Sequence, residues 1–140
     1  MDNIIFEKVW EDECMIEIKV IAISKYATAN QKFYITIEKL DEIVTQIKNY
    51  KDDFTKSLYI ETGSKTGKYT PAFSMYIMPC DMLGKINIEV DIEIDDIRNR
   101  THRCIYYVQS YLGSLEMFNN NLSTFYYSDI GARISLHPTD

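Results

Sequence analysis

The chain has 140 residues, of which 46% are hydrophobic and 26% charged, a composition typical of one globular domain. Its formal net charge is −6 at pH 7 and its sequence pI is about 4.9. Because nucleic-acid binding relies on a basic patch that releases counterions, this balance argues against a nucleic acid as the partner, and equally against an anionic membrane surface. A basic protein is the partner that suits such an acidic domain.

The beginning of the sequence and the cysteines bear on the compartment. Met1-Asp2-Asn3 is acidic rather than basic, and no apolar stretch approaches the roughly 20 residues of a membrane helix. We therefore expect neither a signal peptide nor a membrane span. Cys14, Cys80 and Cys104 are an odd number and lie far apart, which favours a reduced, cytoplasmic compartment.

Alternation of apolar and polar residues predicts strands along most of the chain, and two apolar stripes with helical spacing predict helices. The predicted strands cover residues 4–10, 15–24, 32–38, 55–61, 72–78, 85–95, 103–110 and 132–136. The predicted helices run from residue 40 to near residues 49–51 and over residues 112–124.

Two stretches of the chain resemble each other. Residues 16–23 align with residues 86–93 at an offset of 70. The strand and helix that follow align at an offset of 71, which places Cys104 opposite Phe33 and on the core side. We therefore predict a single α+β domain over residues 1–140. It is built from duplicated β-β-α units at about 15–51 and 85–124, with two helices and mostly antiparallel pairing. Whether the units share one sheet or form two packed sheets stays open.

The polar side of the strand at 85–95 carries a row of acids. Glu89, Asp91, Glu93 and Asp95 lie about 6.6 Å apart along one face, and Asp96 follows. Such a face must be solvated or paired with cations, because like charges repel. It is either a solvated face that also blocks edge aggregation, or a docking surface for a basic protein. The spacing disfavours a metal site, since alternate carboxylates of a strand are too far apart for one ion. These five acids are the candidate partner-binding residues.

No set of residues forms a recognisable catalytic centre. Cys80, His102 and Cys104 supply too few ligands for zinc at the known spacings, and we expect Cys104 to be a buried structural thiol. The sequence contains no phosphate-binding loop and no hydrolase or metalloprotease motif. We therefore expect a protein that is not an enzyme and has no cofactor and no metal.

Several short segments together form a pattern of structural motifs. They are Gly67-Lys68-Tyr69-Thr70-Pro71-Ala72-Phe73-Ser74-Met75, Pro79-Cys80-Asp81-Met82-Leu83-Gly84, Ile88-Glu89-Val90, His102-Arg103-Cys104 and Leu112-Gly113-Ser114-Leu115-Glu116 with Phe118. This pattern resembles the WapI-like family of small bacterial immunity proteins, over roughly residues 4–123. Its motifs are structural rather than catalytic.

The resemblance implies a cytosolic antidote that binds a cognate toxin domain of a polymorphic or contact-dependent system and blocks its active site. Many such toxins are nucleases with basic surfaces, which an acidic face complements. No binding residues carry over from the family, so the acidic row rests on charge alone. The alternative is an accessory or structural domain without catalytic activity, which assembles with copies of itself through exposed strand edges. The sequence leaves the oligomeric state open.

Overall fold

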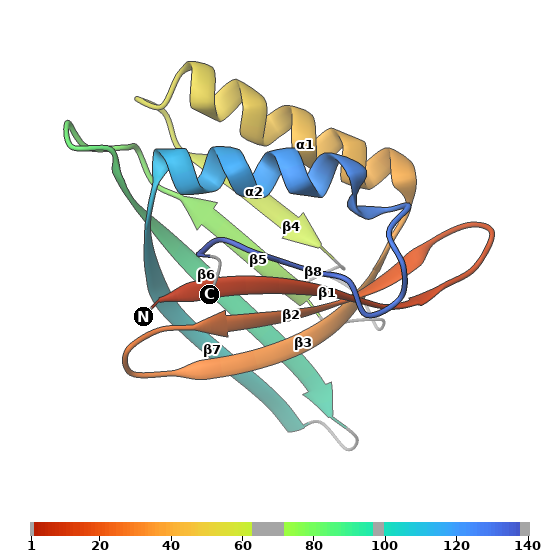
Figure 1. Ribbon diagram of the computed structural model, residues 1–140. Coiled ribbons are helices and arrows are strands. Elements are labelled where there is room, and N and C mark those ends of the chain that lie inside the picture. Colours follow the sequence, from red (N-terminus) through yellow and green to blue (C-terminus); the bar gives the residue numbers. More distant parts are fainter. Residues whose placement is uncertain (1, 63–71, 97–99, 138–140) are drawn as a thin grey trace.

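The computed structural model describes residues 2–62, 72–96 and 100–137, and within them it contains eight strands and two helices (Figure 1). Part of the segment that carries the family resemblance, residues 67–71, lies outside the described residues. The elements are β1 (Asn3–Glu11), β2 (Ile16–Ile23), β3 (Thr28–Ile35), α1 (Ile37–Asp52), β4 (Leu58–Thr62), β5 (Ala72–Ile77), β6 (Lys85–Asp96), β7 (Arg100–Tyr111), α2 (Leu112–Phe125) and β8 (Arg133–Ser135).

The strands form two antiparallel sheets of four strands each. Sheet A has the order β3-β2-β1-β8, and sheet B has the order β4-β5-β6-β7. The two helices lie side by side over one side of the core (Figure 1). The predicted single α+β domain of antiparallel strands with two helices is thus confirmed. The open question of one sheet or two is answered, because there are two sheets.

The halves of the chain exchange strands. Helix α1 follows the β2–β3 hairpin, and helix α2 follows the β6–β7 hairpin. The strand after each helix then joins the opposite sheet, since β4 pairs with β5 and β8 pairs with β1. Each sheet therefore contains three consecutive strands of one half and the last strand of the other half.

The two halves match at a different offset from the predicted one. Ile16 faces Ile35 across the first hairpin, and Ile86 faces Ser110 across the second. The first strands keep the offset of 70, but the second strands and the helices are offset by 75 rather than 71. The buried residues of the helices agree, because Leu40, Ile43, Ile47 and Tyr50 match Leu115, Phe118, Leu122 and Phe125.

The longer second hairpin explains the error about Cys104. The extra residues add three pairs at the turn end of β6 and β7 relative to β2 and β3, up to Asp96 opposite Arg100. The first half of β7 thereby extends past the core, and its side chains are exposed. Cys104 lies in this half and is exposed. The prediction of a buried Cys104 thiol is therefore wrong.

The third strand and first helix begin earlier than predicted. Strand β3 starts at Thr28 rather than residue 32, and α1 starts at Ile37 rather than residue 40. The Thr36 side chain accepts the Lys39 N–H at 3.3 Å, which caps the first turn of the helix. Ile37 continues the alternation of the strand, so the pattern concealed this boundary.

A cluster of aromatic rings joins both sheets and α2 in the core. The ring of Phe6 lies edge-on to those of Phe33, Phe73 and Phe118, with centroids 5.9, 6.3 and 5.2 Å away. Phe33 and Phe73, which come from different sheets, stack on each other at 6.2 Å. Phe6 of the central strand β1 therefore contacts a ring from each neighbouring layer.

A buried lysine attaches the end of the described chain to sheet A. The side chain of Lys8 in β1 is 0% exposed, and its ammonium donates three hydrogen bonds. The acceptors are the Glu11 carboxylate at 2.7 Å and the carbonyls of Tyr126 and Ser128 at 2.8 and 2.7 Å. Both carbonyls belong to the connection between α2 and β8. Lys8 therefore holds the exchanged strand in place by bonds other than the strand ladder.

Candidate protein-binding face

The alternation of residues in sheet B separates a buried face from an outer face. In β6, the side chains of Ile86, Ile88, Val90 and Ile92 are buried in the core. The intervening side chains point to the other side of the sheet. We define the outer face of sheet B by the described side chains of Tyr59, Glu61, Ser74, Tyr76, Glu89, Asp91, Glu93, Arg103, Ile105 and Tyr107.

Among the predicted contact residues whose side chains the structure describes, Asp91 alone lies buried. Its side chain is 7% exposed, and its two carboxylate oxygens accept from Arg103 at 2.7 and 3.1 Å. Arg103 stands one pair away on the neighbouring strand, where a bidentate bond can form. The hydrogen bond and the charge of Asp91 raise the pKa of the Arg103 guanidinium. Asp91 is thus part of the packing of the sheet rather than an accessible charge.

The other predicted acids have different surroundings. Glu89 is half-buried and accepts the Tyr107 hydroxyl at 3.0 Å. Glu93 is half-buried and lies opposite Arg103. Asp95 and Asp96 complete the backbone of β6, but their side chains lie outside the described part of the structure. Of the predicted acids with described side chains, Glu89 and Glu93 are therefore the two that the outer face offers to a partner.

A row of tyrosines crosses all four strands of sheet B. In register, Tyr59 faces Tyr76, Tyr76 faces Glu89, and Glu89 faces Tyr107. Tyr59, Tyr76 and Tyr107 are 46%, 38% and 50% exposed, so each side chain is partly packed against the sheet and partly accessible to a partner. This row was not predicted from the sequence, although all three tyrosines occupy outward positions of their strands. Their common row depends on strand register, which alternation does not encode.

Hydrogen bonds fix the tyrosine rings of this row. The Tyr76 hydroxyl donates to the Ser57 hydroxyl at 2.8 Å, and the Tyr59 hydroxyl donates to Glu61 at 3.2 Å. The bond to Glu89 raises the pKa of the Tyr107 phenol, because the carboxylate stabilises the protonated form. A partner therefore meets rings that have already lost much of their rotational freedom.

The outer face of sheet B is acidic overall. Its described side chains include four carboxylates, on Glu61, Glu89, Asp91 and Glu93, and one cation, on Arg103. Exposed Lys85 at the start of β6 points to the same side and adds a second cation, so the carboxylates still outnumber the cations by two. Exposed Ile105 adds an apolar contact beside Tyr107. Tyrosine, which combines an apolar ring with a polar end, is enriched at protein-binding surfaces.

The residues considered for metal or thiol chemistry do not form a centre. Cys104 and His102 are exposed on β7, and Cys80 is half-buried in the segment before β6. Burial raises the pKa of the Cys80 thiol, which disfavours the reactive thiolate. Within the described residues, no group of three or more His, Cys, Asp or Glu side chains is arranged to hold a metal ion.

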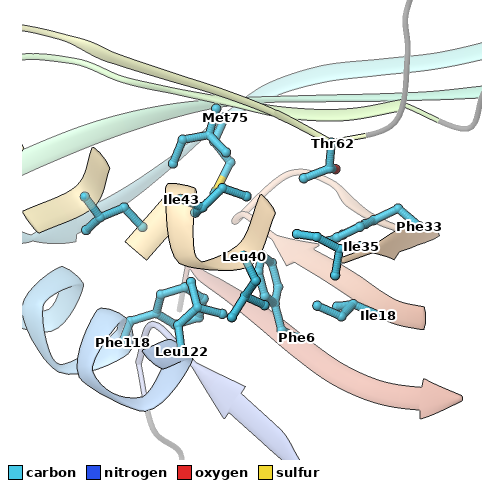
Figure 2. Close-up of a pocket in the computed structure, with 12 residues that line it drawn as sticks. Phe6, Ile18, Phe33, Ile35, Leu40, Ile43, Thr62, Met75, Phe118 and Leu122 are labelled. Carbon is cyan, nitrogen blue, oxygen red and sulfur yellow. The ribbon is translucent and has the colours of Figure 1, made fainter. Parts of the chain in front are cut away.

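The cavity inside the core is too small and too apolar for a ligand site. It lies between the two helices and both sheets, where Phe6, Leu40, Ile43 and Phe118 approach one another (Figure 2). Its volume is about 10 Å³, which is near the smallest space that holds one water molecule. This cavity therefore does not serve as a ligand site.

Comparison with protein-family models, curated protein sequences and solved structures finds no match to this chain. In the part of the chain that the structure describes, neither helix is long and apolar enough to cross a membrane. The candidate face therefore rests on its own geometry and charge.

The pairing of Asp91 leads to a prediction about stability. We expect Asp91→Asn to lower the free energy of unfolding by about 2 kcal/mol, because a bidentate charged hydrogen bond is lost at a buried position. Glu93→Gln, two residues along the same strand, is the control and should change it by less than about 0.5 kcal/mol. Urea unfolding followed by circular dichroism measures both. Equal effects of the two substitutions would contradict the buried role of Asp91.

Proposed function

We propose that this chain is a cytoplasmic, non-catalytic binding protein that neutralises a basic bacterial toxin domain by covering it with the outer face of sheet B. The observation that carries the proposal is the tyrosine row of Tyr59, Tyr76 and Tyr107 within an acidic sheet face. The toxin as partner rests on the resemblance of the sequence to WapI-like immunity proteins. The basic character of the partner rests on charge.

The chemistry of the face supports a protein partner. Tyrosine is enriched among the residues that dominate binding energy, because a large ring is ordered at low entropic cost. Carboxylates around such rings accelerate association with a basic surface and disfavour acidic competitors. The net charge of −6 extends this attraction beyond the face itself. A nuclease toxin has the complementary charge, since it must bind a polyanion.

The test is a binding measurement with a defined partner. The probe is the C-terminal domain encoded by the gene immediately upstream, titrated calorimetrically at low and high ionic strength. We expect a one-to-one complex that weakens as salt rises. Glu89→Lys combined with Glu93→Lys should weaken it at least about tenfold at low salt, because two attractive charges become repulsive. Asp91 is left unchanged, since its substitution would disturb the fold.

A matched control separates the face from net charge. Asp41→Lys combined with Glu42→Lys makes the same change of charge on exposed positions of α1, at the other side of the molecule. This variant should retain the affinity to within about threefold. If both double substitutions weaken the complex equally, the choice of face is wrong, although tight binding of the unmodified chain still supports the toxin proposal. If the chain does not bind the upstream domain at all, the alternative of an accessory domain is favoured. Sedimentation then measures whether the chain associates with itself.

A further inference from the structure

A groove runs beside the outer face of sheet B, between edge strand β7 and the β2–β3 turn. Its walls and floor come from both sheets and from the start of the described chain. The residues that line it are Asp2, Ser24, Lys25, Tyr26, Met78, Asn87, Ile105, Tyr106, Tyr107 and Gln109. Ile105 and Tyr107 belong to both surfaces, so the groove continues the outer face around the edge of the sheet.

The backbone of β7 presents polar groups on this side. The N–H of Gln109 points away from β6, since it donates to the Asp2 carboxylate at 3.0 Å. In an antiparallel strand, alternate residues direct their N–H and C=O groups to the same side. The N–H and C=O groups of Ile105 and Tyr107 therefore also point away from β6, along the edge that borders the groove. Their two carbonyls and the Asp2 carboxylate can accept hydrogen bonds from a ligand, while their N–H groups can donate.

Tyr106 fixes the two walls of the groove relative to each other. Its hydroxyl donates to the Ala22 carbonyl at 2.6 Å and accepts the Ala29 N–H at 3.0 Å. These two residues lie on either side of the β2–β3 turn, so the turn is held against β7. The groove is thus built into the fold and does not depend on a partner to form it.

Aromatic rings supply the remaining surfaces. The ring of Tyr26 is exposed, and the ammonium of the neighbouring Lys25 lies 5.4 Å from its centre, within cation–π range. Tyr107 of β7 also lines the groove; its ring is half-exposed, and its hydroxyl donates to Glu89 at 3.0 Å. Among the lining residues, Asp2 carries the one negative charge and Lys25 the one positive charge.

We propose that this groove binds an arginine side chain of the basic partner. A guanidinium has five donors in one plane and stacks on aromatic rings, so it matches a carboxylate, outward strand carbonyls and tyrosine faces together. A lysine ammonium matches less well, because it is a strongly hydrated point charge that does not stack as a plane. The proposal deepens the proposed function and rests on it for the identity of the partner. The groove itself is tested on the chain alone.

The experiment is an NMR titration of the ¹⁵N-labelled chain with N-acetyl-arginine methylamide. The citrulline analogue has nearly the same shape but no charge and is the neutral control. The lysine analogue keeps the charge without the planar group, so it tests whether the planar guanidinium is needed. We expect saturable shifts of the amide signals of Asp2, Ile105, Tyr107 and Gln109. The citrulline analogue should bind about tenfold more weakly, because it loses the charge-assisted bonds to Asp2. Equal shifts with citrulline, or arginine shifts that map elsewhere, would overturn the proposal.

Two variants identify the groups responsible. Asp2→Asn retains an oxygen that accepts the Gln109 N–H but removes the charge, so the fold should persist while arginine binding weakens about tenfold. Tyr107→Leu removes the ring from an exposed position and should weaken binding by several-fold. Asp41→Asn on α1 is the matched control and should change nothing. Arginine binding that survives Asp2→Asn and Tyr107→Leu would contradict the assignment.

The outcome is distinguishable from that of the toxin experiment. Arginine binding without a toxin complex would keep the groove and overturn the partner. A toxin complex without arginine binding, and indifferent to Asp2→Asn, would keep the partner and overturn the groove. If both hold, Asp2→Asn should also weaken the toxin complex about tenfold, by the same lost charge.

Discussion

Replacing Lys8 by methionine should lower the free energy of unfolding by about 3–5 kcal/mol, because its buried ammonium makes two charge-assisted hydrogen bonds to backbone carbonyls, each worth about 1.5–3 kcal/mol. Methionine is similar in length, so the loss comes from hydrogen bonds rather than volume. The carbonyls of Tyr126 and Ser128 would lose their donor, and Glu11 would lose its cation. The equivalent position of sheet B holds Ile77, which shows that this site in a sheet does not itself require a lysine.

The measurement is urea unfolding at equilibrium, with hydrogen exchange of the amides of β8 as a local readout. Lys39→Met is the control, because Lys39 forms an exposed pair with Glu42 at 3.7 Å, and its loss should cost less than about 0.5 kcal/mol. In the Lys8 variant, β8 should exchange faster than β2. A loss below about 1 kcal/mol would mean that the connection to β8 is held by other contacts.

Phe6→Ala should also cost about 3–5 kcal/mol, because it empties a site where aromatic rings from four elements meet. The ring of Phe6 contacts Phe33, Phe73 and Phe118, and it borders the small core cavity. Removing it would join the new space to that cavity, and neighbours held in two sheets and a helix have little freedom to collapse into it. Thermal and urea unfolding measure the loss.

Phe54→Ala is the matched control for this substitution. Phe54 is 40% exposed, and its backbone carbonyl, which accepts the Cys80 N–H at 2.9 Å, stays in place. The decrease in the free energy of unfolding should be at most about half of that for Phe6→Ala, because folding buries less apolar area of the Phe54 side chain. Equal losses would show that the aromatic cluster is not the centre of the core.

The sequence predicted the elements of this fold well because the apolar periodicities of its strands and of its helices are both clear. Apolar residues two apart in β2 and β6 face one core, and a stripe with helical spacing lies along each helix. All eight strands were expected close to where they lie. The strand order was not, because alternation says which side of a strand is buried but not which strand pairs with it. The exchange of β4 and β8 between the sheets depends only on which strands pair, so alternation could not predict it.

The errors have local causes. The alignment of the halves slipped because Ile35 of the first half corresponds to Ser110 of the second, so a matching apolar pattern was found at a shorter offset. That slip placed Cys104 in the core, although the longer hairpin carries it past the core. The cap at Thr36 was overlooked because the apolar alternation continues through Ile37.

The candidate site was predictable only in part. The acidic row of β6 is visible in the sequence, and Glu89 and Glu93 lie on the outer face as its alternation implies. The burial of Asp91 was not visible, because it depends on Arg103 of the next strand. The tyrosine row was not visible either, since its members come from β4, β5 and β7 and meet only through the register of three strand pairs.

The exchange of strands has a consequence for how the chain folds during synthesis. Strand β1 cannot complete its pairing until β8 is made, and more than 120 residues separate them. At about 5–20 residues per second, the open edge of β1 waits roughly 6 to 25 seconds on the ribosome. The amino-terminal half is therefore a poor independent folding unit. Through this interval, sheet A is exposed to strand addition from other nascent chains, and a chaperone that covers this edge would protect it.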